Sequence, residues 1–365
     1  MAAATARVTE SPGLPIMSAT LLCYCRAGFE PELAAELGER AALAGYPGYA
    51  RATRGDGYVL FHAAEESSGL SAALPWQRLV FARQKLELIA ELAQIDARDR
   101  ITPVLQALEG LGRYGDLWVE HPDSDDGRPL SALARSFGNA LRPALRKRGF
   151  LSERDEPRLP RLHVFLVAGD HLLLARADRT DSAPWPLGIP RLRVHADAPS
   201  RSALKLEEAL VSLLDERERD KWIQPGMRAA DLGAAPGGWT WVLTRRHLHV
   251  TAIDNGPMQP ALLDTGLVRH LREDGFHWAP DRTLDWLVCD MVDQPRKVAA
   301  RMGDWFRNEW CRHAVFNLKL PMKKRWQEVQ LCLDLFREAA GRPVHIRARQ
   351  LYHDREEITV FATAR

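Results

Sequence analysis

The sequence predicts an α/β protein in which an α+β first half precedes a second half built on a doubly wound, mainly parallel sheet. Three observations lead to this prediction. From Pro199 onward, short apolar strands alternate with amphipathic helices, as in strand–helix–strand units. Before Thr180, helices are interspersed with returning strands and a hairpin. Between Thr180 and Ser200, four prolines and the lack of any periodic run mark a junction between the two halves.

Composition leaves the class of partner open. The 365 residues are enough for two or three domains. An apolar content of 46% and a charged content of 27% are ordinary for a soluble globular protein. A net charge of +2 neither requires nor excludes a polyanionic partner, so the distribution of charge along the chain matters more.

Cysteine usage and hydropathy point to the cytoplasm. The five cysteines are an odd number without any C-x-x-C pair, so we interpret them as reduced thiols and expect no metal site. No uninterrupted apolar run approaches the ~20 residues of a membrane span, and we expect no membrane association. Residues 1–18 have no charged segment before a long apolar core, so we interpret them as a disordered leader rather than a signal peptide.

The first half is expected to contain two modules, over residues 19–95 and 96–180. In the first, we expect a strand in 19–28, a helix in 29–45, a strand in 56–63 and a strand in 76–92 that carries Arg83 and Lys85. In the second, we expect a helix in 100–112, a strand in 116–123, an amphipathic helix in 129–150 and a hairpin in 161–177 that turns at Gly169 and Asp170.

Basic residues gather on the long helix of the second module and just beyond it. They are Arg142, Arg146, Lys147, Arg148, Arg154, Arg158 and Arg161. Two interpretations stay open. The residues form either a solvated helix end with ordinary surface ion pairs, or a face that contacts phosphates.

Residues 181–198 are expected to form a linker, and residues 199–365 the second half. The predicted helices there are 202–220, 237–247, 295–311 and 325–341, and the predicted strands are 227–233, 248–254, 283–291, 313–320, 344–352 and 357–364. In a doubly wound sheet, ligands lie outside the carboxyl ends of the strands. The chemistry of this half is therefore expected in the residues that follow each strand.

The segment DLGAAPGG, residues 231–238, follows the first of these strands. Glycine permits unusual φ values and a close approach of the backbone to a ligand. The spacing of Gly233, Gly237 and Gly238 does not fit G-x-G-x-x-G, which disfavours a dinucleotide dehydrogenase. No Lys-Ser/Thr pair follows, which excludes a P-loop.

Asp254 ends the next strand, about twenty residues beyond the glycine turn, where an acidic side chain can accept hydrogen bonds from ribose hydroxyls. An acidic group suits a positively charged sulfonium cofactor better than a pyrophosphate. An aspartate at a strand end is by itself often only a turn or cap residue. The neighbouring glycine turn favours the cofactor interpretation.

Two further strands end in charged residues, Asp290 in DWLVCDM and Lys319 in FNLKLP. A lysine that closes an apolar strand is costly to bury unless it is paired, although its stem can also extend the ammonium into water. Lys205 and Glu357 complete a set of two bases and two acids at this edge of the sheet.

The basic residues near this edge have two possible roles, phosphate contact or a solvated basic surface. They are Lys323, Lys324, Arg325, Arg347 and Arg349. We expect the tryptophans of this half to be core residues rather than surfaces on which bases stack.

Several segments in order resemble the bacterial 23S ribosomal RNA cytidine 2'-O-ribose methyltransferases of the M type. The matching segments are LLCYCRAGFE, LVFARQ, DRITPV, GIPRLRVHADAPSRS, DLGAAPGGWT, DNGPM, LREDGF, CDMV, FNLKLPMKKR and ARQLYHDREEITV. The resemblance is close from about Pro199 to Thr359 and extends into the first half. It implies a ferredoxin-like module and a THUMP domain as an RNA-binding half, joined to a Rossmann-like methyltransferase domain.

The resemblance also implies S-adenosylmethionine as the methyl donor and a cytidine 2'-hydroxyl of 23S rRNA as the acceptor, on naked rRNA or on a large-subunit assembly intermediate. The cofactor-contacting positions that it implies are Ser202, Ala235, Pro236, Gly237, Gly238, Asp254, Asp274 and Asp290. Lys205, Asp290, Lys319 and Glu357 match a Lys-Asp-Lys-Glu catalytic tetrad. Lys319 is expected either to act as the general base or only to position the 2'-oxygen. The protein is expected to be a monomer or a weak dimer.

This sequence departs from the family pattern at Ala235, where close relatives have cysteine, and in the longer leader before Ala19. A backbone N–H can serve equally well at position 235. Two other functions are weighed against 2'-O-methylation. One is a non-catalytic RNA-binding assembly factor that keeps the fold, which the complete tetrad disfavours. The other is base methylation, which the lack of an NPPY-like loop and of a Pro-Cys nucleophile disfavours.

Overall fold

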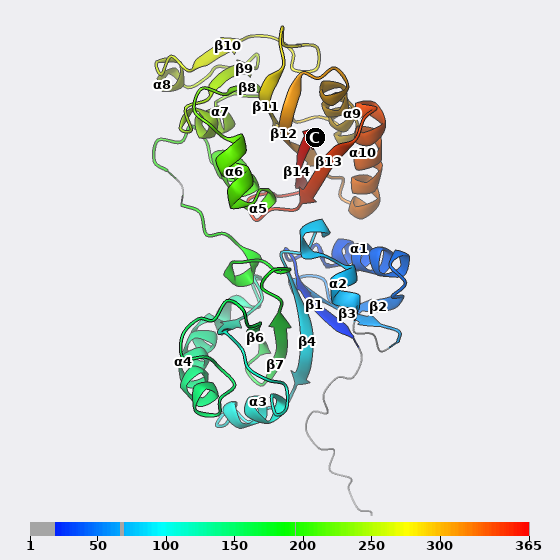
Figure 1. The fold of residues 1–365 in the computed structure, drawn as a ribbon, viewed down its shortest axis with the longest axis vertical. Helices are drawn as coiled ribbons and strands as arrows, with labels where there is room; N and C mark the ends of the chain where they lie inside the picture. Colours follow the sequence, from blue (N-terminus) through cyan, green and yellow to red (C-terminus); the bar gives the residue numbers. More distant parts are fainter. Residues whose placement is uncertain (1–18, 66–68, 194, 365) are drawn as a thin grey trace, which may run out of the picture. The chain divides into compact units, whose positions relative to one another are not determined.

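The computed structural model describes residues 19–65, 69–193 and 195–364, so the predicted leader lies outside the described residues. The chain divides into two compact units (Figure 1). The first takes in the chain as far as Trp76 together with Arg83–Gly188, and the second comprises Gln77–Ala82 and Ile189–Arg365. Among the described residues, no helix is both long and apolar enough to cross a membrane.

The first unit is built on one seven-stranded sheet in the order β2-β3-β1-β4-β7-β6-β5. Its strands are β1 Thr20–Tyr24, β2 Gly48–Arg51, β3 Tyr58–Ala63, β4 Gln84–Leu92, β5 Asp116–Glu120, β6 Arg161–Ala168 and β7 His171–Ala177. Its helices are α1 Glu30–Leu43, α2 Leu70–Ala73, α3 Ile101–Ala107 and α4 Ser131–Lys147. Neighbouring strands are antiparallel except for the parallel pair β5 and β6. Because β4 pairs with both β1 and β7, the two predicted α+β modules share a single sheet.

Helix α4 shows why this part of the sequence is helical and how it packs. Ala134, Phe137, Leu141 and Leu145 recur at helical spacing and are all buried. They pack against apolar side chains of β6 and β7, including Leu162 and Leu174. The predicted strand over residues 76–92 is shorter than expected, because Trp76–Arg78 forms a 3-10 turn and β4 begins only at Gln84.

The second unit contains a seven-stranded sheet in the order β10-β9-β8-β11-β12-β14-β13. Its strands are β8 Arg228–Leu232, β9 His249–Ile253, β10 Val268–Leu271, β11 Leu284–Cys289, β12 Cys311–Lys319, β13 Val344–Arg349 and β14 Glu357–Ala364. Its helices are α5 Ala203–Leu213, α6 Glu216–Trp222, α7 Gly238–Thr244, α8 Pro260–Leu263, α9 Pro295–Arg307 and α10 Arg325–Ala340. The first five strands of the sheet run parallel, β14 runs antiparallel to them, and β13 runs antiparallel to β14, which confirms the predicted mainly parallel sheet.

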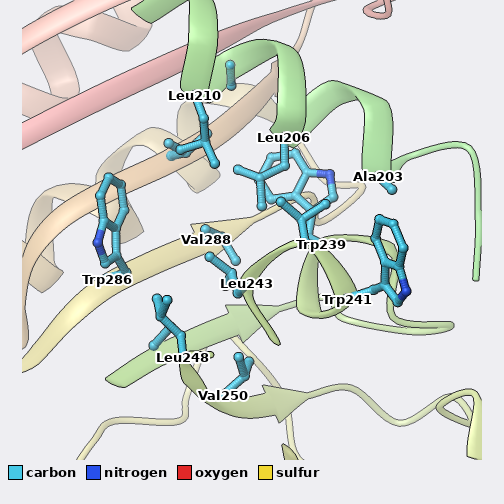
Figure 2. Close-up of a cluster of buried hydrophobic side chains, with 14 of the residues drawn as sticks. Ala203, Leu206, Leu210, Trp239, Trp241, Leu243, Leu248, Val250, Trp286 and Val288 are labelled. Carbon is cyan, nitrogen blue, oxygen red and sulfur yellow. The ribbon is translucent and has the colours of Figure 1, made fainter. Parts of the chain in front are cut away.

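Helices cover both faces of this sheet. Leu206 and Leu210 of α5 and Trp239 of α7 belong to one core cluster with Trp286 and Val288 of β11 (Figure 2). On the other face, the ring of Phe336 in α10 lies 5.5 Å from that of Phe316 in β12. Because strand side chains alternate, the odd-numbered residues of β12 face α5 and α7, and the even-numbered residues face α9 and α10.

In this unit one predicted helix is wrong in its extent, and two short elements were missed. The helix expected over 202–220 breaks at Leu214, and Asp215 begins α6 with a capping box in which Asp215 and Glu218 cap each other's backbone N–H groups. The short edge strand β10 and the helix α8 were not predicted. With four residues each, they are too short to show a periodic pattern.

Candidate functional site

The residues singled out in the sequence gather at the carboxyl edge of the parallel strands. Strand β8 ends at Leu232, and the turn 233–237 leads directly into α7. Gly233 and Gly237 have φ values of 76° and 116°, a region that favours glycine. The backbone of this turn therefore depends on glycine at both positions.

The turn forms a tight cradle. A methyl group added to Gly237 would overlap Leu262 of α8. One added to Gly238 would overlap the hydroxyls of Ser200 and Ser202, whose two oxygens lie 2.5 Å apart. The carbonyl of Ser202 accepts a hydrogen bond of 3.0 Å from Nε1 of Trp239, so the start of α5 is held against the start of α7. The structure thus brings Ser202 together with the glycine turn.

Asp254 holds the same turn from the end of β9. Its Oδ2 accepts a hydrogen bond of 2.9 Å from the backbone N–H of Ala235, and its Oδ1 accepts one of 2.7 Å from that of Gly256. Each carboxylate oxygen keeps a further lone pair for a ligand hydroxyl. The N–H of Ala235 donates to Asp254, and this hydrogen bond orders the turn in this structure.

Asp274 lies further from the turn than the other predicted cofactor residues. Its exposed carboxylate accepts hydrogen bonds from the backbone of Phe276 and the ring of His277, each at 2.8 Å, and these lower its pKa. The next residue, Gly275, is buried, and a methyl group added to it would meet Met291 and Leu232. The structure places Asp274 beside the ends of β8 and β11, without a hydrogen bond to the other predicted cofactor residues.

The four charged residues of the predicted tetrad form one connected cluster. Nζ of Lys319 lies 2.7 Å from Oδ1 of Asp290 and also contacts Oε2 of Glu357. Nζ of Lys205 lies 2.5 Å from Oε1 of Glu357 and 3.4 Å from Oδ2 of Asp290. Each carboxylate therefore bridges the two lysines. Charge is balanced within the cluster, which reduces the cost of partial burial.

Secondary structure sets this geometry. Lys319 and Glu357 are direct partners in the antiparallel pair of β12 and β14, and Asp290 follows the neighbouring strand β11. Lys205 reaches the cluster from the first turn of α5. Glu208, one helical turn further on, accepts hydrogen bonds of 2.8 and 2.9 Å from the backbone of Tyr352 and His353. Helix α5 thus fixes both a tetrad lysine and the loop that precedes β14.

The environment of Lys319 has opposing effects on its pKa. Burial lowers the pKa of this lysine, but the carboxylates of Asp290 and Glu357 outweigh burial and raise it above its usual value. Lys319 is therefore an ammonium in the ligand-free cluster. The field of the two carboxylates opposes its use as a base until another cation enters the site.

Sequence reasoning missed two buried polar residues beside this site. Asp231 in β8 accepts a hydrogen bond of 2.6 Å from the hydroxyl of Thr240, and burial raises its pKa to about 7. Within the described part of the chain, its Oδ1 has no hydrogen-bond partner. Asn317 donates a hydrogen bond of 2.9 Å to Oδ1 of Asp290. The period of two in a strand, counted back from Lys319, could have identified Asn317.

Several of the basic residues proposed for phosphate contact are engaged inside the protein. Arg347 pairs with Glu218 at 2.5 Å, and Arg325 is buried in an ion pair with Glu356. Lys323 and Lys324 are exposed. In the first unit, Arg142 pairs with Asp116 at 3.2 Å and Arg148 pairs with Glu109. These pairs fit the ordinary ion-pair interpretation at those positions.

The described residues contain no group of three histidine, cysteine or acidic side chains placed to hold a metal ion. All five cysteines are buried and none is in a disulfide.

Comparison with known proteins shows three family matches in chain order. Residues 17–86 match the RlmM ferredoxin-like domain, and residues 99–177 match the N-terminal domain of ribosomal RNA large subunit methyltransferase M. Residues 198–333 match the FtsJ-like methyltransferase family. Together with the strand order, the last match identifies the second unit as a Rossmann-like methyltransferase fold.

Two relatives that match nearly the whole chain carry the same name. The ribosomal RNA large subunit methyltransferase M of Xanthomonas axonopodis pv. citri (strain 306) is 68% identical over 342 residues, which cover 94% of this chain and 98% of that protein. The protein of the same name from Xanthomonas oryzae pv. oryzae (strain MAFF 311018) is 67% identical over the same length and coverage. On its family matches and on this identity along nearly the whole chain, the protein belongs to the ribosomal RNA large subunit methyltransferase M family.

Proposed function

We propose that this protein transfers the methyl group of S-adenosylmethionine to the 2'-hydroxyl of a cytidine ribose in 23S rRNA. The observation that carries the proposal is the position of Lys319, whose ammonium is held between Asp290 and Glu357 at the edge of the sheet where the glycine turn lies. Membership of the family makes the protein an S-adenosylmethionine-dependent rRNA methyltransferase. Beyond family membership, we propose that the 2'-hydroxyl is the group that receives the methyl, and we propose the roles of the individual residues.

The residues at the turn fit a cofactor that carries a ribose and a positive charge. The carboxylate of Asp254 would accept from ribose hydroxyls, and the glycine turn at Gly237 and Gly238 would present its backbone to the ligand beside Ser202. The orphaned Oδ1 of Asp231 offers a buried acceptor next to the turn. Asp274, beside the ends of β8 and β11, would close the far side of this site. When bound, S-adenosylmethionine supplies an electrophilic methyl group on its sulfonium.

Lys319 is the proposed general base. Its Nζ, once deprotonated, would take the proton of the 2'-hydroxyl as the oxygen attacks, and such proton transfer typically contributes ~10²–10⁴-fold to a rate. Lys205 and a bound sulfonium place positive charge near Lys319, which lowers the cost of deprotonation. Asp290 and Glu357 orient the amine. Holding the hydroxyl in line with the methyl group supplies a further part of the rate.

We further propose that the first unit binds the RNA. In this proposal, a ferredoxin-like module over 19–95 and a THUMP domain over 96–180 lead through a linker over 181–198 to the methyltransferase domain over 199–365. The substrate is 23S rRNA or a large-subunit assembly intermediate in the cytoplasm. The protein acts as a monomer or a weak dimer.

Transfer of labelled methyl groups from S-adenosylmethionine to rRNA fragments and assembly intermediates tests the proposal. Nuclease digestion should yield a cytidine with the label on its ribose. Label on the base would instead establish base methylation. Intact RNA binding without transfer to any of these substrates would leave a non-catalytic assembly factor.

A further inference from the structure

Three buried polar side chains extend from the tetrad into the core of the second unit. The amide Nδ2 of Asn317 lies 2.9 Å from Oδ1 of Asp290, and the hydroxyl of Thr359 lies 2.7 Å from Oδ1 of Asn317. The two carboxyl oxygens of Asp354 lie 3.0 and 3.2 Å from the same hydroxyl. Asn317, Thr359 and Asp354 each have 0% of their surface exposed, so water does not interrupt the chain.

The direction of each hydrogen bond follows from the groups involved. Asp290 balances the lysines as a carboxylate that only accepts, so Asn317 must direct its NH₂ toward Asp290 and its carbonyl toward Thr359. The carbonyl of Asn317 accepts, so the single hydroxyl proton of Thr359 is directed to it. The contact between Thr359 and Asp354 then needs a proton that only the carboxyl group of Asp354 can supply.

We infer that Asp354 is a neutral carboxylic acid that begins a one-way hydrogen-bond chain through Thr359 and Asn317, and that this chain positions Asp290 for Lys319. The protonation of Asp354 follows from the hydrogen-bond geometry alone. The positioning role rests on the function proposed above. In this chain Asp354 acts on Asp290 through Thr359 and Asn317.

The surroundings of Asp354 agree with a proton on it. Burial and the neighbouring carboxylates of Glu357 and Glu208 raise its pKa well above the usual value, against the opposing effects of the Leu351 N–H and of Lys205. The Leu351 N–H donates a hydrogen bond of 2.9 Å to Oδ2 of Asp354. Glu208 anchors the same loop through the backbone of two residues that follow Leu351, so the loop keeps the carboxyl group in place.

The chain gives Asn317 one orientation. If its amide turned over, its carbonyl would face the carboxylate of Asp290, and its NH₂ would face the hydroxyl of Thr359. With Thr359 as donor, the amide stays in the orientation that stabilises the charge on Asp290. Asp290 therefore keeps one oxygen toward Lys319, and its negative potential at the Lys319 ammonium is reduced by the Asn317 donor.

The first experiment compares Thr359→Val with Thr363→Val in the full-length protein. Thr363 lies on the same strand and the same face, is equally buried, and bonds to His313 at 2.9 Å rather than to the tetrad. We expect Thr359→Val to lower kcat for methyl transfer roughly tenfold, with KM for RNA and Kd for S-adenosylmethionine within about twofold. Thr363→Val should leave kcat nearly unchanged. Equal effects of the two substitutions would overturn the positioning role.

The pH–rate profile distinguishes a loss of positioning from a general loss of structure, because a general loss of structure would not shift the profile along the pH axis. Without the anchored Asn317, Asp290 presents more uncompensated charge to Lys319. The limb of the profile in which the rate rises with pH should therefore shift to higher pH in Thr359→Val and in Asn317→Ala, and it should stay in place in Thr363→Val. An unshifted limb in the first two variants contradicts the chain.

The second experiment tests the proton on Asp354. Asp354→Asn can donate to Thr359 and accept from the Leu351 N–H, so it should keep kcat within about threefold, whereas Asp354→Ala should resemble Thr359→Val. Infrared difference spectra at neutral pH should show a protonated carboxyl band that Asp354→Asn removes. No such band, or equal damage by both substitutions, overturns the inference. The band needs no methyl transfer, so it also decides the question if the proposed function fails.

Discussion

Lys319 and Glu357 face each other across the antiparallel pair of β12 and β14, and the two oxygens of Glu357 contact Lys319 and Lys205 separately. Strand register places Lys319 on one oxygen of this carboxylate, and the first turn of α5 places Lys205 on the other. Asp290, at the end of the neighbouring strand, bridges the same two lysines from the other side. The cluster is therefore assembled by strand register and by one helix turn.

Removing the amine of Lys319 should abolish methyl transfer and leave cofactor binding nearly intact. The amine is the proposed proton acceptor, so we expect Lys319→Ala to reduce kcat by about 10³-fold or more, with Kd for S-adenosylmethionine within a few-fold. Single-turnover transfer and equilibrium binding measure the two quantities. Lys221→Ala, at an exposed lysine on α6, is the control. Near-normal turnover of Lys319→Ala would show that another group accepts the proton.

The glycine turn should tolerate no side chain at position 237. Gly237 and Gly266 both have positive φ values, 116° and 70°, but only at Gly237 would an added methyl group meet neighbouring atoms. Gly266→Ala therefore measures backbone strain alone, about 1–2 kcal/mol. We expect Gly237→Ala to lower stability further and to weaken S-adenosylmethionine binding at least tenfold. Thermal unfolding and calorimetric titration test this, and equal behaviour of the two variants would remove Gly237 from the cofactor cradle.

Asp231 should make stability fall as pH rises toward neutrality. Burial raises its pKa from 3.8 to about 7, so between these values the folded protein binds a proton that the unfolded chain has released. Stability therefore declines from about pH 4 to about pH 7, by roughly 4 kcal/mol at most, and then levels off. Asp231→Asn removes this titration. The free energies of unfolding of the two proteins, measured against pH over this range, should converge or cross. Parallel pH dependences would contradict the prediction.

Charge reversal on α4 should weaken RNA binding if this face contacts phosphates. Lys147 is exposed there, while Arg146 bonds to the carbonyl of Ser152 and Arg148 pairs with Glu109. Changing all three to glutamate should reduce affinity and lower the salt slope by up to about 0.7 per lost contact. Binding to an rRNA fragment at several salt concentrations measures both. Arg337→Glu, in the second unit, shows the effect of one charge reversal away from α4, and an unaltered slope in the triple variant would return α4 to an ordinary solvated surface.

The fold of the second unit was largely predictable because its signals are local. Apolar strands, amphipathic helices and the glycine turn each occupy a short segment, and the alternation of strand and helix implies a parallel sheet. The four-residue elements β10 and α8 were not predictable in this way. The break at Leu214 was also missed, although the Asp215 and Glu218 capping pair that causes it is visible in the sequence.

The candidate site was predictable in part. Asp254, Asp290 and Lys319 could be singled out because strand ends in such a sheet converge on one edge. Lys205 and Glu357 were added as a second base and a second acid, and the family resemblance then matched them to a tetrad. The structure shows the contacts that join them to the other two residues. A basic side chain in the sequence does not reveal its partner, and so the internal pairing of Arg347 with Glu218 could not be predicted.

The sequence by itself determined the order of strands and helices, the glycine turn and the residues that end each strand, because these depend on side-chain period and turn chemistry within a few residues. Tertiary structure alone decided which charges meet. Residues as distant as Lys205 and Glu357 become partners only when α5 packs on the sheet beside β14. It also decided that Asn317, Thr359 and Asp354 form one hydrogen-bonded chain, because cross-strand register and burial leave these groups no water to bond with.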